Sequence, residues 1–117
     1  MPWINVTCRK TLSEEHQDEA KAELAKILDD VLGKEESGLF ITFNKAYGFY
    51  RAGQRNDDSA IFDVRYIGNF VLDKKREVTT RIANYFKELL GLDPEKVIVI
   101  FNEVSSENWG RHQGNYS

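Results

Sequence analysis

Four short segments of the chain carry the apolar side chains expected of β-strands. In residues 2–8, Ile4, Val6 and Cys8 alternate with Trp3 and polar positions, and this period of two is typical of a strand with one buried face. The run from 97 to 101 has little polar content, which indicates a strand buried on both sides. The predicted strands are residues 2–8, 39–44, 60–67 and 97–101.

Two longer segments repeat apolar side chains every three or four residues, which predicts two amphipathic helices. The first follows Thr11-Leu12-Ser13-Glu14, which offers a capping box from Thr11 and an alternative N-cap in Ser13. It ends near residue 32, where Gly33 supplies the left-handed residue that often closes a helix. The second helix covers residues 73–90 and ends at Gly91 in the same way.

The remaining segments are short or rich in turn-forming residues. Residues 47–50 predict a short edge strand, and residues 53–59 predict a polar loop. The C-terminal residues 105–117 contain Gly110 and Gly114 among aromatic side chains. This composition favours a short terminal ribbon.

The chain contains the same strand–helix–strand unit twice, at an offset of 58 residues and without a gap. Gly33 aligns with Gly91, and Asn44 aligns with Asn102. Two strands joined through a right-handed helical crossover run parallel in one sheet. We therefore expect a two-layer α+β fold, with two helices on one face of a four-stranded mixed sheet. The expected single domain spans residues 1–117, with repeats 2–44 and 60–102 and a ribbon at 105–117.

Two helices on one face leave the other face of the sheet uncovered. Residues 39–43 and 97–101 nevertheless carry apolar side chains on both faces, and such strands are normally covered on both sides. We therefore expect a closed oligomer in which the open faces of the sheets meet at the centre. The alternative is that loops and the C-terminal tail cover this face.

Composition and charge exclude several kinds of partner. Sixteen Lys and Arg against 19 Asp and Glu give a net charge of −3, which argues against a nucleic-acid partner. No apolar stretch approaches the roughly 20 residues that span a membrane. The first residues lack a signal-peptide core, so we expect a cytoplasmic protein. Cys8 is the only cysteine, and His16 and His112 lack ligand spacing, so we expect no disulfide within the chain and no metal site.

Together these features resemble the tautomerase superfamily, and within it the macrophage migration inhibitory factor (MIF) family. The resemblance extends over nearly the whole chain and rests on the duplicated unit, on Pro2 after the initiator methionine, and on four short stretches. These are Leu32-Gly33-Lys34, Tyr66-Ile67-Gly68, residues 92–97 and Asn108-Trp109-Gly110. The resemblance implies a homotrimer whose three sheets form a barrel, with three active sites at the subunit interfaces.

The resemblance implies that Pro2 is the catalytic residue. A proline at a free N-terminus is a secondary amine and hence a base, whereas a proline within the chain is not. An apolar pocket or nearby cations lower the pKa of such an amine toward neutrality, where it suits proton transfer at carbon. Met1 precedes Pro2 and must be removed for this role. The alternative is a proline that only begins an edge strand.

Two further residues match substrate-binding positions of the family. Lys34 is expected to hold a carboxylate or carbonyl oxygen of the substrate, although a lysine after a helix also complements the helix dipole and needs no other role. Ile67 matches a position whose backbone N–H binds a substrate oxygen, and Gly68 permits close approach of the backbone. Ile67 serves equally well as a core residue that ends a strand.

The expected walls of the pocket depart from the family pattern. The family places a tyrosine and an asparagine on the last long strand, reaching into a neighbour's site, where this chain has Ile98 and Ile100. Arg111 replaces a tryptophan and is expected to clamp a carboxylate, unless it is a solvated residue of the ribbon. The other expected wall residues are Phe101, Trp109 and Tyr116, together with Ile98.

We therefore expect an isomerase: an enol–keto tautomerase of small 2-keto acids such as phenylpyruvate, with Pro2 as general base and no cofactor. A second hypothesis is a non-enzymatic trimer with an interaction or structural role, favoured by Ile98 and Ile100. A third is a dehalogenase, decarboxylase or hydratase activity. Glu103 matches a dehalogenase-type acid, but Gly68-Asn69-Phe70 stand where those enzymes carry an arginine pair.

Overall fold

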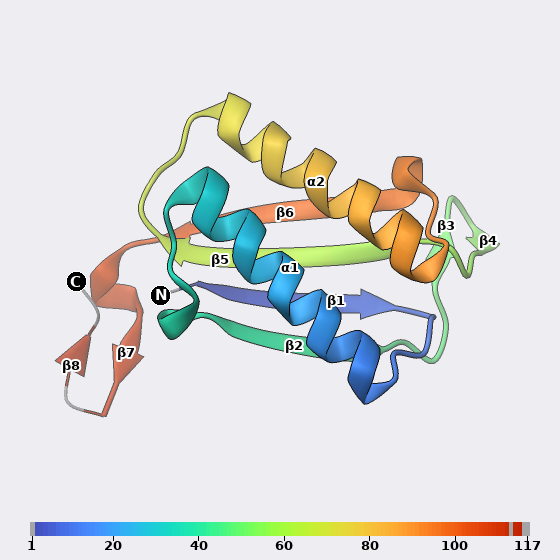
Figure 1. Cartoon of the computed structure of the whole chain (residues 1–117), viewed down its shortest axis with the longest axis horizontal. Helices are drawn as coiled ribbons and strands as arrows, with labels where there is room; N and C mark the ends of the chain where they lie inside the picture. The colour runs from blue at the N-terminus through green and yellow to red at the C-terminus, as the bar shows by residue number, and fades with distance from the viewer. Residues whose placement is uncertain (1, 113, 116–117) are drawn as a thin grey trace.

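The computed structural model describes residues 2–112 and 114–115, and its main elements form two strand–helix–strand units. The first unit consists of β1 (Trp3–Cys8), α1 (Glu14–Leu32) and β2 (Phe40–Lys45), and the second of β5 (Ala60–Ile67), α2 (Leu72–Leu90) and β6 (Val97–Val104). The six strands and helices form two layers, because both helices lie across one face of the sheet (Figure 1).

The four long strands lie in the order β2-β1-β5-β6. Within each unit the two strands are parallel, and the units meet through the antiparallel pair β1 and β5. The predicted α+β fold with a four-stranded mixed sheet is confirmed. The antiparallel contact also relates the two units by an approximate twofold rotation, so equivalent loops lie at opposite ends of the sheet.

The helix ends follow their local sequence signals. The side chain of Ser13 accepts a hydrogen bond from the backbone N–H of His16 at 3.1 Å, so Ser13 rather than Thr11 is the N-cap of α1. Gly33 and Gly91 close the two helices with left-handed φ values of 66° and 70°.

The core lies between the helices and the side of the sheet that they cover. Burial alternates along β1 and β5, so every second side chain points to the helices. The rings of Phe62 and Phe86 meet edge to face at 4.8 Å and join β5 to α2. The largest fully buried side chains are Tyr66, Phe62, Phe86, Ile4, Leu24, Ile27, Leu28, Ile82, Leu92, Val6, Val64 and Val78.

Three predicted segments differ from the structure by more than one residue. The edge strand expected at residues 47–50 and the loop expected at 53–59 give way to a separate hairpin of β3 (Tyr50–Arg51) and β4 (Gln54–Arg55). The hairpin turns at Ala52 and Gly53, with φ values of 52° and 78°, as two-residue turns require. Strand β6 continues to Val104, beyond the expected end at 101.

Short elements complete the chain. Three 3-10 turns cover Glu36–Gly38, Pro94–Lys96 and Ser106–Asn108. The terminal ribbon is present as the antiparallel pair β7 (Gly110–Arg111) and β8 (Gly114–Asn115), which projects beyond the end of the sheet where β1 begins (Figure 1). Across the described residues, no helix has the length and apolar character needed to cross a membrane.

The face of the sheet without helices is polar in its middle and apolar along β6. The indole N–H of Trp3 donates to the Thr42 hydroxyl at 3.0 Å, and that hydroxyl donates to Asn5 at 2.6 Å. On β6, Ile98 and Ile100 remain 51% and 45% exposed. The described part of the chain therefore leaves this apolar edge open to solvent.

Candidate active site

Residues from separate segments meet at the end of the sheet where β1 begins, which we call the Lys34 end: Pro2, Lys34, residues 66–70 and Glu103. Pro2 is buried, and its carbonyl accepts the N–H of Phe40 at 2.9 Å. Trp3 pairs with Arg65 in the antiparallel register, so one further step places Pro2 opposite Tyr66. The predicted general base therefore lies at the start of a central strand, next to the end of β5.

Lys34 reaches across from the first unit to the second. After the left-handed turn at Gly33, the Lys34 backbone N–H donates to the Leu28 carbonyl at 3.2 Å, which completes the helix end. The Lys34 ammonium then donates to the Ile67 carbonyl at 2.7 Å and lies 5.8 Å from the centre of the Phe70 ring. The structure thus brings together Lys34 and Ile67, two of the predicted substrate-binding residues.

Gly68 shapes the turn that follows β5. Its φ of 124° is a conformation that residues with a Cβ rarely adopt, and a Cβ here would lie 3.9 Å from the Lys34 ammonium. Gly68 therefore permits the backbone conformation that presents the Ile67 carbonyl to Lys34. It is not needed to avoid a steric clash.

Glu103, which the sequence related only to a dehalogenase-type acid, is a polar residue of this end whose contacts were not predicted. One carboxylate oxygen accepts the Phe70 N–H at 2.8 Å and the Tyr66 hydroxyl at 3.0 Å, and the other lies 3.3 Å from the Lys75 ammonium. The Phe70 amide lowers the pKa of the Glu103 carboxyl most, and Tyr66 and Lys75 lower it further, against an opposing effect of partial burial. An acidic residue at the end of an apolar strand was the available signal.

The expected wall residues do not form one surface within the chain. Phe101 lies on the helix side of the sheet, with its ring 6.5 Å from that of Tyr66, whereas Ile98 lies on the opposite, open face. Trp109 lines an apolar hollow with three residues of the open face, Trp3, Phe40 and Thr42. Arg111 is an exposed residue of β7, and Tyr116 lies outside the described residues.

Two further features of this region were not predicted. The guanidinium of Arg65 lies 5.3 Å from the Trp3 ring centre and is held by Asp63, whose hydrogen bonds raise the pKa of Arg65. A second hollow, of about 370 Å³, lies between residues 67–69 and 103–105. Among residues 2–112 and 114–115, no three His, Cys, Asp or Glu side chains are grouped as a metal site requires.

Comparisons with known proteins agree with this fold. Residues 69–116 match the family model described as tautomerase enzyme. The macrophage migration inhibitory factor-like protein of Entamoeba histolytica is 22% identical over 98% of both chains, with a TM-score of 0.84. MIF2 of Leishmania major is 21% identical over 99% of this chain and 97% of its own, with a TM-score of 0.87.

A more distant fold match is a fused 4-OT described as a wild-type symmetric trimer. It is 15% identical, over 96% of this chain and 93% of its own, with a TM-score of 0.82. A comparison with curated protein sequences gave no match. The family model supports the predicted resemblance over residues 69–116, and the structural matches confirm the predicted fold.

Proposed function

We propose that this protein, a member of the tautomerase superfamily, is an enol–keto tautomerase of small 2-keto acids such as phenylpyruvate. One observation carries the proposal: Pro2, Lys34 and Ile67 come from three separate segments and lie at the same end of the sheet, with Lys34 bonded to Ile67 at 2.7 Å. A base, a cation and a backbone segment in one place are what this proton transfer needs.

The proposed reaction needs no change in oxidation state. The free Pro2 amine takes a proton from the carbon next to the keto group, and the electrons of that C–H bond form the enol double bond. The same proton is then delivered to the enolate oxygen, so atoms and charge balance. An ammonium has three N–H donors, and Ile67 occupies one of those on Lys34. Within residues 2–112 and 114–115 no second acceptor binds this ammonium, which leaves its other donors for the substrate's carboxylate or enolate oxygen.

A homotrimer is part of the proposal. The fused 4-OT with the same fold is described as a symmetric trimer. Ile98 and Ile100 are exposed on the open face of the sheet, where contact with another copy would cover them. In such a trimer Ile98 would contribute to a neighbouring copy's pocket. Trp109 lines a hollow with Trp3 and Phe40, which begin β1 and β2 at the Lys34 end of its own chain. Arg111 belongs to β7, which projects beyond that end (Figure 1).

The test is phenylpyruvate enolisation by protein whose intact mass shows that Met1 has been removed. The Pro2→Gly variant keeps a free amine but not the secondary amine, and its kcat/KM should fall by roughly 10²–10⁴-fold. Pro94→Ala changes the only other proline, at the start of a 3-10 turn, and should keep the wild-type rate. Equal rates for the wild type and Pro2→Gly would overturn the proposal.

A second candidate function is a non-enzymatic trimer that binds other macromolecules or has a structural role. The observation in its favour is that Ile98 and Ile100, both exposed, replace the polar pair expected in the family's pocket. Sedimentation of the Met1-free protein as a trimer, with no enolisation above that of Pro2→Gly, would favour this candidate. A cytoplasmic location and the absence of a cofactor remain predictions in either case.

A further inference from the structure

The carboxylate of Glu103 joins β6 to the segment that follows β5. Figure 1 shows the end of β6 beside the loop that leads from β5 to α2. Glu103 accepts from the Phe70 N–H at 2.8 Å and from the Tyr66 hydroxyl at 3.0 Å, and it forms an ion pair with Lys75 at 3.3 Å. Its side chain is 24% exposed, and its hydrogen bond with the Tyr66 hydroxyl is partly buried.

Glu103 contacts Phe70, whose ring lies near the Lys34 ammonium, and Tyr66, which directly precedes the Ile67 carbonyl that this ammonium binds. The ring of Phe70 meets the ring of Tyr66 edge to face at 5.2 Å, and the Lys34 ammonium lies 5.8 Å from the centre of the Phe70 ring. The Lys34 ammonium also donates to the Ile67 carbonyl at 2.7 Å. Glu103 therefore bonds to both aromatic residues that flank the segment contacting Lys34.

This segment needs an external constraint. Gly68 has a φ of 124° and has far more conformational freedom in the unfolded chain than a residue with a side chain. Glu103 accepts hydrogen bonds from the Tyr66 hydroxyl and from the Phe70 N–H, which restrain the chain on both sides of this glycine. Charge-assisted hydrogen bonds are stronger than those between neutral groups, which suits them to this role.

The same contacts argue against a role for Glu103 as the base that activates water. Both carboxylate oxygens are engaged by donors from the protein. The Phe70 amide above all holds the pKa of this carboxyl below its ordinary value, which makes it a weak proton acceptor. Glu103 thus acts on the site through other residues.

We propose that Glu103 is a positioning residue, which holds residues 66–70 in the conformation that receives the Lys34 ammonium between the Ile67 carbonyl and the Phe70 ring. The expected effect of Glu103 on catalysis rests on the proposed function, because it supposes that Lys34 binds the substrate. The expected effect of Glu103 on the conformation of residues 66–70 does not rest on that function, and the two effects are measured separately.

The experiment compares Glu103→Ala with Lys45→Ala. Lys45 occupies the equivalent place in the first unit, 58 residues earlier, so its variant controls for loss of a polar side chain at a strand end. The first readout is amide hydrogen exchange, and the second is the NMR signal of the Lys34 ammonium. We expect the Phe70 amide to exchange about tenfold faster or more in Glu103→Ala, while amides of β1 keep their protection. The Lys34 signal should shift in Glu103→Ala and stay in place in Lys45→Ala.

The third readout separates positioning from catalysis. In the phenylpyruvate assay, Glu103→Ala should raise KM about tenfold, with a smaller effect on kcat, because it disturbs binding by Lys34 rather than Pro2. Glu103→Gln keeps an acceptor for the Phe70 N–H, so its increases in Phe70 exchange and in KM should be smaller than those of Glu103→Ala. It replaces Glu103→Ala if that variant does not fold. Unchanged exchange of Phe70 and an unchanged Lys34 signal would overturn the inference. Altered exchange in a protein that has no activity would uphold it and count only against the proposed function.

Discussion

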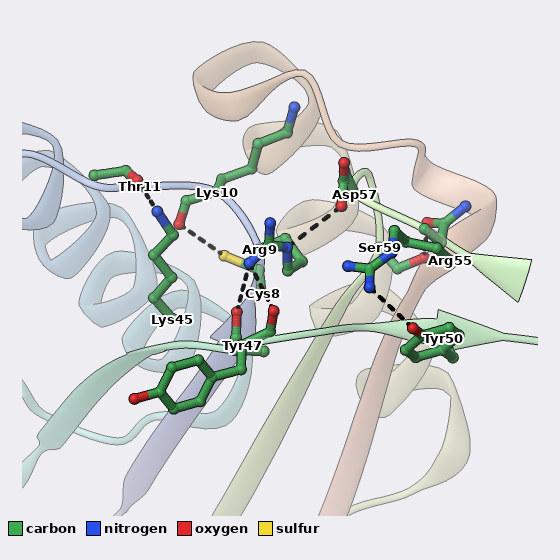
Figure 2. A network of polar contacts seen from close by, with 12 residues as sticks. Cys8, Arg9, Lys10, Thr11, Lys45, Tyr47, Tyr50, Arg55, Asp57 and Ser59 are labelled. Carbon is green, nitrogen blue, oxygen red and sulfur yellow. Dashed lines mark hydrogen bonds and ion pairs between the residues drawn. The ribbon is translucent and has the colours of Figure 1, made fainter.

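The two ends of the sheet are built from equivalent parts of the duplicated unit, yet they differ in chemistry. At an offset of 58 residues, the segment 66–70 of the Lys34 end aligns with residues 8–12, and Glu103 aligns with Lys45. We call this second region, residues 8–12 with Lys45, the Lys45 end, and Figure 2 shows its polar contacts. At each end a polar side chain from the close of one strand reaches the loop that follows the neighbouring strand.

The polar contacts at the Lys45 end connect the segment that follows β1 with the end of β2 and the residues after it. The Lys45 ammonium donates to the Thr11 hydroxyl at 2.7 Å, and the Arg9 guanidinium donates to the carbonyls of Ala46 and Tyr47 at 3.0 and 2.9 Å (Figure 2). The thiol of Cys8 is buried, and burial raises its pKa. These interactions hold the loop before α1 against the segment after β2.

Two aligned positions place the candidate base and cation at one end only. Ala60 stands where the first unit has Pro2, and Leu92 stands where it has Lys34. Leu92 is 2% exposed and belongs to the core, whereas the Lys34 ammonium is bonded to the backbone of the other unit. The two ends of the sheet thus have a similar backbone arrangement, and the candidate chemistry depends on a few side chains that only one end carries.

Exchanging the residues at the aligned positions 34 and 92 should give the largest effect. Leu92→Lys removes a buried leucine and buries an ammonium, so we expect a loss of at least about 3 kcal/mol in the free energy of unfolding. Lys34→Leu loses one charge-assisted hydrogen bond and should cost about 1–2 kcal/mol, with a fall in phenylpyruvate activity. Urea unfolding at one fixed protein concentration measures both. Equal costs would show that position 92 tolerates a cation as position 34 does.

Substitution of the glycines that close the two helices should have the same effect on stability, because the two helix ends have the same local structure. Gly33 and Gly91 have φ values of 66° and 70°, and an added Cβ would meet no atom within 4 Å at either. Gly33→Ala and Gly91→Ala should each lower the unfolding free energy by about 1 kcal/mol, through backbone strain alone. Thermal and urea unfolding of both variants test this. Clearly unequal losses would mean that the two helix ends are not equivalent in energy.

The N-caps of the helices should respond in opposite directions. Ser13 caps α1 through its hydroxyl, whereas the aligned Val71 before α2 has no acceptor to offer and is 66% exposed. Ser13→Val should cost about 1 kcal/mol, and Val71→Ser should stabilise the protein by up to about 1 kcal/mol. The unfolding midpoints in urea give both signs. A loss of stability in Val71→Ser would contradict the helix-cap explanation.

The smallest effect is a difference in acid stability between the two ends. The pKa of Glu103 in the folded protein lies below its ordinary value of 4.5, mainly through the Phe70 amide. The ionised carboxylate therefore stabilises the fold fully above about pH 4.5, and this contribution is lost as the pH falls through the lower, folded-state value. In urea unfolding from pH 7 to 3, the free energy of unfolding should fall less steeply with decreasing pH in Glu103→Gln than in the wild type.

The matched variant for the acid experiment is Lys45→Gln. It removes a charge from the equivalent place, but it removes no group that titrates in this range. We expect the unfolding free energy of Lys45→Gln to fall with decreasing pH as steeply as that of the wild type. A less steep fall in Lys45→Gln as well would mean that the change in net charge, and not the contact between Glu103 and Phe70, causes the effect of Glu103→Gln.

The elements of each unit could be predicted because their signals are local. Ser13, Gly33 and Gly91 act on their own helix ends, and the period-two pattern of residues 2–8 already separates the buried face from the open one. The hairpin of β3 and β4 escaped prediction because one of its two turn residues is Ala52, which carries no signal for a left-handed conformation. The family resemblance likewise identified the candidate residues Pro2, Lys34 and Ile67.

The arrangement of those residues depends on contacts that local patterns do not encode. The hydrogen bonds from Lys34 to Ile67 and from Phe70 to Glu103 each join residues 33 positions apart. They form because β1 lies antiparallel to β5 and because β6 ends beside the loop before α2. The same packing places Phe101 with the helices and Ile98 on the open face. Local propensities determine which residues are available for chemistry, and only the packing of the two units decides which of them meet, because contacts distant in sequence depend on strand order and register.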